Sequence, residues 1–100
     1  MFSFFNRNRR LLKQEEKGNT RAVLRLLNRG ADVNATDEDG FSPLIEALRW
    51  QHQDTAEALI SAGADVHART LIFHETALKL ALKAGHRETA KLLRSAGASE

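Results

Sequence analysis

The chain has no cysteine and no tyrosine, and only one tryptophan and one proline among its 100 residues. Without cysteine it forms neither a disulfide framework nor a thiolate metal cage, so a reducing, cytoplasmic location is expected. No apolar run approaches the roughly 20 residues that cross a bilayer. The opening MFSFFNRNRR has too short an apolar stretch for a secretory signal, and its charges follow that stretch instead of preceding it.

What is present suffices for one small domain with a modest core. Apolar residues make up 42% of the chain, which is more than a disordered segment contains. Because the aromatics are five Phe and one Trp, leucine and alanine must build most of that core.

Charge is distributed in three bands along the chain. The formal charge is +6 over residues 1–30, −7 over 31–68 and +3 over 69–100, which gives +2 in total. A nucleic-acid surface needs a continuous stripe of one sign, so no nucleic acid is expected as a partner. An alternative is attachment to a membrane or polyanion through Arg7, Arg9 and Arg10, against the simpler interpretation of a solvated helix start or tail.

An internal repeat organises the sequence. GADVNA at 30–35 recurs 33 residues later as GADVHA at 63–68, and as a truncated GA at 97–98. A second motif, SPLIEA at 42–47, is echoed 34 residues later as TALKLA at 76–81. Units of this length are supersecondary elements that bury a shared core by stacking.

The first helix of each unit has a clear start signal. Ser42 is suited to cap the first turn with its hydroxyl. Pro43 follows at the first helical position, where its missing N–H is not needed. Thr76 takes the cap role in the next unit, so helices are predicted over about 43–50 and 77–84.

The second helix of the middle unit is predicted to begin near Asp54, because Asp54-x-x-Glu57 forms a capping-box pattern. It is predicted to end at Gly63, since glycine commonly follows a helix C-terminus. The equivalent helices are expected over about 20–29 and 87–96.

The turn between the two helices of a unit needs a residue with positive φ, which glycine adopts without strain. Gly85 provides it in the last unit. Gln51 stands at the corresponding place in the middle unit, and either some strain or a slightly altered turn is therefore predicted there.

Together, the period and the two motifs, which keep the same phase, resemble the ankyrin repeat over residues 11–98. The resemblance implies an all-α fold, an α-solenoid of stacked helix–turn–helix repeats with loop or hairpin connections. The expected organisation is an apolar and basic extension at 1–10 and a repeat domain at 11–100, divided at about 11–35, 36–68 and 69–100.

The connections between units differ from each other. The Asp-x-x-Gly hairpin of the family is present at 37–40. The loop at 69–75 has one inserted residue, contains no glycine and carries three consecutive apolar residues at 71–73. Its tight hairpin is therefore expected to be lost or reshaped.

Catalytic machinery is not evident in the sequence. There is no cysteine nucleophile and no glycine-rich phosphate loop, and Ser42 is explained as a helix cap. The carboxylates of Asp37, Glu38 and Asp39 would be solvated on an exposed turn, which suits them poorly to acid–base work. The four histidines lack metal-ligand spacing, so no enzyme activity, cofactor or metal is expected.

Binding of a protein partner is the function that the sequence favours. In a solenoid, variable side chains gather on one face, and the resemblance implies contact through the loop tips and the ends of the first helices. The candidate partner-binding residues are Glu38, Asp39, Phe41, Arg49, Trp50, Leu71, Ile72, Phe73 and Lys83. The acidic residues expected to steer a basic partner are Asp37, Glu38, Asp39 and Glu46.

Structural roles are alternatives for these residues. Trp50 could cover a helix end as part of the core, and residues 71–73 could fold back over the last unit or prolong its first helix. Self-association into a homodimer through the open ends of the stack is also an alternative. It is suggested by the weakly polar last helix, with Ala90, Leu92, Leu93 and Ala96.

Overall fold

A computed structural model describes residues 20–37, 39–71 and 73–99 of the chain. These residues form five α-helices, and the all-α prediction is confirmed. In chain order they are α2 (Thr20–Asn28), α3 (Pro43–Arg49), α4 (Gln53–Ser61), α5 (Ala77–Lys83) and α6 (Arg87–Ser95). The predicted extension at 1–10, with its arginines, lies outside the described residues.

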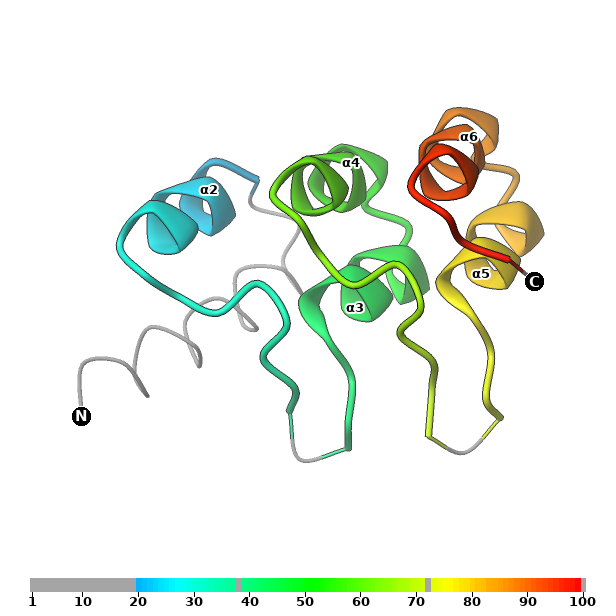
Figure 1. Cartoon of the computed structure of the whole chain (residues 1–100), viewed down its shortest axis with the longest axis horizontal. Helices are drawn as coiled ribbons and strands as arrows, with labels where there is room; N and C mark the ends of the chain where they lie inside the picture. Colours follow the sequence, from blue (N-terminus) through cyan, green and yellow to red (C-terminus); the bar gives the residue numbers. More distant parts are fainter. Residues whose placement is uncertain (1–19, 38, 72, 100) are drawn as a thin grey trace.

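The helices stack in two rows (Figure 1). Helices α2, α4 and α6 form one row, and α3 and α5 form the other. Helix α3 packs on α4 and α5, and α4 also packs on α2 and α6. None of these short helices could bury its apolar side alone, so the core is shared between neighbouring units. Its largest fully buried apolar side chains are Val23, Leu44, Ile45, Leu59, Leu78 and Leu93.

The predicted caps of the first helices are confirmed. The Ser42 hydroxyl accepts a hydrogen bond from the backbone N–H of Ile45 at 3.3 Å, and Thr76 accepts one from Lys79 at 3.1 Å. Each bond satisfies a backbone donor that the helix itself leaves without a partner. Helices α3 and α5 end one residue before their predicted ends.

The predicted cap of α4 is wrong. The N-cap is His52, which makes no hydrogen bond from its side chain to the helix end, and α4 begins at Gln53. The carbonyl of His52 accepts the first helical hydrogen bond, from Ala56 at 2.9 Å. Asp54 is therefore inside the first turn, where its charge favours the positive end of the helix dipole.

Two side-chain hydrogen bonds connect the first unit with the second. The hydroxyls of Thr20 and Thr55 lie 2.6 Å apart, which joins the starts of α2 and α4. The side-chain oxygen of Asn34 accepts from the backbone N–H of Asp65 at 2.7 Å. The recurring GADVNA motif thus contributes to the contact between neighbouring loops.

The strained turn predicted in the middle unit is confirmed. Gln51 has φ of 60°, in the left-handed region, and the equivalent Gly85 has φ of 75°. A side chain with a Cβ in this conformation costs about 1–2 kcal/mol relative to the right-handed form.

Gln51→Gly is therefore expected to raise the free energy of unfolding by about 0.5–1 kcal/mol, after the larger chain entropy of glycine is subtracted. The matched variant is Gly85→Gln, where an added Cβ would have open space around it, so backbone strain alone is tested. This variant should lower the free energy of unfolding by a similar amount. Urea unfolding followed by circular dichroism measures both, and equal stabilities would contradict the strain argument.

Both hairpins project from the row of α3 and α5 (Figure 1). In the first, one carboxylate oxygen of Asp37 accepts from the backbone N–H groups of Asp39 and Phe41, both at 2.9 Å. The second is reshaped instead of lost. A backbone bridge joins Arg69 and Thr76, and Thr70 forms two hydrogen bonds with the backbone of Glu75, both at 3.0 Å.

Candidate protein-interaction surface

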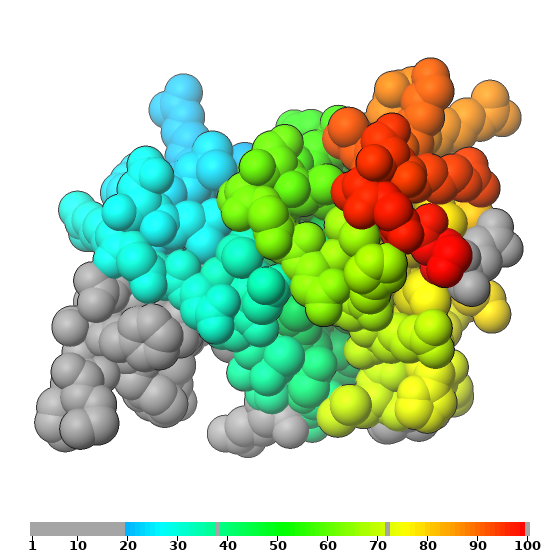
Figure 2. Space-filling model, in the orientation of Figure 1, coloured from blue at the N-terminus to red at the C-terminus, as the bar shows by residue number. Residues whose placement is uncertain are grey.

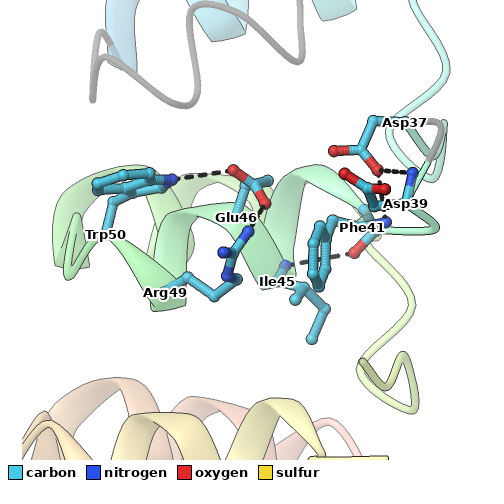
Figure 3. Close-up of polar contacts among 8 residues, drawn as sticks. Asp37, Asp39, Phe41, Ile45, Glu46, Arg49 and Trp50 are labelled. Carbon is cyan, nitrogen blue, oxygen red and sulfur yellow. Dashed lines mark hydrogen bonds and ion pairs between the residues drawn. The ribbon is translucent and has the colours of Figure 1, made fainter. Parts of the chain in front are cut away.

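Four side chains on α3 and directly beside its ends form the first part of the candidate site, which we name the α3 cluster: Phe41, Glu46, Arg49 and Trp50 (Figure 3). Arg49 and Trp50 follow Glu46 by three and four residues, a spacing that places side chains on one side of a helix. Phe41 precedes the helix at the end of the first hairpin.

Glu46 is the centre of the α3 cluster. Its Oε1 atom accepts from Nη1 of Arg49 at 2.5 Å, and its Oε2 atom accepts from Nε1 of Trp50 at 2.9 Å. The guanidinium carbon of Arg49 lies 4.1 Å from the centre of the Phe41 ring, a cation–π distance. One carboxylate therefore orients both the arginine and the tryptophan.

The predicted role of Glu46 as a steering charge is wrong. Only 7% of its surface is exposed, and its carboxylate is engaged by Arg49 and Trp50. The sequence signal for this arrangement is the spacing of three and four residues from Glu46 to Arg49 and Trp50, which brings side chains together on one side of a helix. In the next unit the equivalent position holds Leu80, so a polar network replaces an apolar contact in the middle unit.

The interpretation of Trp50 as a core residue is also wrong, because 51% of its surface is exposed. Its indole N–H is already satisfied by Glu46. The surface that it offers to a partner is therefore the apolar part of the ring, in an orientation held by the hydrogen bond.

Glu46→Leu is expected to weaken partner binding by about 1 kcal/mol, because Trp50 and Arg49 lose the acceptor that orients them. The free energy of unfolding should stay unchanged or rise, since the desolvation of a carboxylate is removed and Leu80 shows that leucine fits this position. Titration with a protein partner measures the affinity, and urea unfolding measures the free energy of unfolding. Glu46→Gln, which keeps one acceptor, is the control. Unchanged affinity in the leucine variant would refute the positioning role.

The third unit replaces this cluster with a single ion pair. Lys83, which stands one unit after Arg49, places its Nζ atom 2.6 Å from Oε2 of Glu75. The hydrogen bond from Lys83 lowers the pKa of Glu75 below its ordinary value. The contribution of the pair to stability is therefore present at neutral pH and is lost as the pH falls through that lowered pKa. The pair is at the surface, so this contribution is small.

The tips of the two hairpins form the second part of the candidate site, which we name the tip surface: Asp39, Gly40, Leu71 and Phe73. Leu71 is 60% exposed and Phe73 is 78% exposed. These two neither fold back over the last unit nor prolong α5, which begins at Ala77. Glu38 and Ile72, also predicted as binding residues, lie outside the described residues.

The two tips touch each other. A Cβ atom built on Gly40 would lie 2.4 Å from Cδ1 of Leu71, so glycine is what allows the leucine to lie against the first hairpin. Figure 2 shows the two hairpins side by side along one edge of the molecule. The contact between Gly40 and Leu71 thus joins the two tips, although they come from different units.

A family model describing ankyrin repeats in three copies matches residues 15–99. The chain belongs to the ankyrin repeat family. Ankyrin repeats are generally protein–protein interaction modules, and the family is typically non-catalytic.

Several curated proteins contain similar ankyrin repeats. The human "Ankyrin repeat domain-containing protein 49" is 45% identical over 65 residues, which cover 64% of this chain and 27% of that protein. The Drosophila melanogaster "Ankyrin repeat and KH domain-containing protein mask" is 37% identical over 95 residues, which cover 94% of this chain and 2% of that protein. The chain therefore spans about a quarter or less of the length of these relatives.

The described part of the ankyrin chain shows neither a metal centre nor a membrane-spanning helix. No group of three or more His, Cys, Asp or Glu side chains there is arranged to hold a metal ion. None of the described helices is both long enough and apolar enough to cross a membrane.

Proposed function

We propose that this ankyrin repeat chain is a scaffold or adaptor module without catalytic activity of its own. It binds a protein partner through the α3 cluster and the tip surface. A cytoplasmic location is part of the proposal, on the ground that the chain has no cysteine. The observation that carries the proposal is the half-exposed Trp50, held in one orientation by a buried carboxylate.

The composition of the α3 cluster supports this function. Tryptophan and arginine are among the residues most enriched at the energetic centres of protein interfaces. Trp50 and Arg49 are already oriented by Glu46 before a partner arrives, which reduces the side-chain entropy lost on binding. Neither residue is needed to fill the core of the stack.

Affinity capture from an extract of the source cells tests the proposal. The wild-type chain should retain a protein that the Trp50→Ala/Phe73→Ala double variant does not. Leu92→Ala, on an exposed position of α6, serves as the control and should retain the same protein. If wild type and double variant retain the same proteins equally, the proposed surface is not the binding surface.

Self-association is a second candidate, and one observation favours it. Leu48 is 3% exposed, whereas Leu82, at the same position one unit later, is 39% exposed. The third unit therefore exposes an apolar side chain at a position that the second unit buries. Sedimentation over a concentration range tests this candidate, with Leu82→Glu expected to reduce association. A wild-type chain that stays monomeric at high concentration would exclude it.

A further inference from the structure

The tip surface combines exposed apolar side chains with negative charge, and this combination specifies the chemistry of what it binds. We propose that it receives an extended segment of a partner protein in which a lysine or arginine stands close to a large apolar side chain. The inference rests on the proposed protein-binding function and adds the class of ligand to it.

The apolar part of the tip surface comes from the second hairpin. Leu71 and Phe73 are 60% and 78% exposed, although turn residues in a water-soluble loop are normally polar. Leu71 is supported from one side by Gly40, so it has a defined place beside the first hairpin. An exposed apolar group with charged neighbours is typical of a contact surface.

The negative part comes from the first hairpin. Asp37 uses one carboxylate oxygen to accept from the backbone N–H groups of Asp39 and Phe41, which fixes the shape of the tip. The carboxylate of Asp39 itself makes no hydrogen bond or ion pair within the described residues. The sequence adds a further acidic residue at position 38. The first hairpin therefore carries three acidic residues and no basic one.

Two of the cations near this surface are already paired with carboxylates, and a third, Arg69, belongs to the base of the second hairpin and not to the tips. Arg49 is paired with Glu46, and Lys83 is paired with Glu75. Arg69 lies at the base of the second hairpin, where its backbone pairs with that of Thr76. Among the described tip residues, 37, 39–41, 71 and 73, the charged side chains are the carboxylates of Asp37 and Asp39. The charge at the tips is therefore negative, and charge complementarity selects a basic ligand.

The contact between the hairpins also limits the spacing within the ligand. Because Leu71 lies against Gly40, the residue after Asp39, the acidic and apolar parts are adjacent. Residues in an extended segment advance by about 3.3 Å each. A basic and an apolar side chain one or two positions apart would reach both parts at once.

Selection of random short peptides displayed on phage, with the whole chain as bait, tests this inference. We expect the selected peptides to be enriched in lysine or arginine within two positions of a large apolar residue. A synthetic copy of a selected peptide should lose about tenfold in affinity with Asp39→Asn and again with Phe73→Ser. Both variants change exposed side chains, and circular dichroism verifies that each remains folded.

Two matched controls separate the site from general effects of charge and apolar surface. Glu88→Gln removes an exposed carboxylate on α6, and Leu24→Ser removes an exposed apolar side chain on α2. Neither should change the affinity of the peptide, whereas salt should weaken its binding to the wild-type chain.

The failures of the two proposals give different results. Selected peptides that are acidic, or that bind equally to the Asp39→Asn and Phe73→Ser variants, overturn the inference about the ligand. If those peptides still lose affinity with Trp50→Ala, protein binding at the α3 cluster stands. If the wild-type chain selects no peptide above the Trp50→Ala/Phe73→Ala background, both the inference and the proposed surface fail.

Discussion

Leu59→Ala is expected to lower the free energy of unfolding by about 2–5 kcal/mol. Leu59 is fully buried on α4, the helix that packs on α2, α3 and α6. Truncation to alanine removes apolar contacts and leaves a cavity that short, mutually supporting helices fill poorly. Helix α4 thus connects helices of all three units, so the loss affects the three units together.

The size of this effect matters because so small a solenoid has little stability to lose. Small domains have unfolding free energies of about 5–15 kcal/mol. Thermal and urea unfolding, followed by circular dichroism and by the fluorescence of the single tryptophan, measure the change. Leu24→Ala, at an exposed position of α2, is the control and should change stability by less than about 0.5 kcal/mol. An unchanged melting temperature for Leu59→Ala would contradict the stacking described above.

Trp50→Ala is expected to weaken binding of the cognate partner by about 1–4 kcal/mol. The ring is half exposed and oriented by Glu46, so it offers apolar area without needing to be ordered on binding. Isothermal titration calorimetry with the captured partner measures the change. The effect should arise mainly from faster dissociation, since the substitution removes contact area and no charge.

The same variant separates binding from folding. Trp50 follows the last residue of α3 and contributes little to the core, so the free energy of unfolding should change far less than the affinity. Phe73→Ala, at the tip surface, should weaken the same partner if both parts of the site are used together. A Trp50→Ala chain that binds with wild-type affinity would remove the α3 cluster from the proposed interface.

Much of the fold could be predicted from local sequence signals. The caps at Ser42 and Thr76 and the glycine after each second helix act on residues only a few positions away, so they locate helix ends within about one residue. The failure at Asp54 has the same local origin. Aspartate is favourable both at an N-cap and in a first turn. The backbone conformation at His52 decides between these two positions for Asp54, because it makes His52 the N-cap.

The candidate site was less predictable than the fold. Residue type identified Trp50, Arg49 and Phe73 as candidates, because tryptophan and arginine are common at interfaces and apolar loops are unusual. The role of Glu46 was mistaken, because a glutamate in an acidic stretch resembles any solvated charge until its burial is known. The contact between Leu71 and Gly40 joins residues from different units and has no local signal.

Local pattern therefore established the repeat, the helices and their order, since each depends on interactions between residues close in the chain. The stacking of units decided which side chains are exposed and which side chains contact one another. Leu48 and Leu82 are the same residue type at the same position of successive units, yet one is buried and the other is exposed. Residue type and position in the repeat do not distinguish them, so their exposure depends on what packs against each of them in the folded chain.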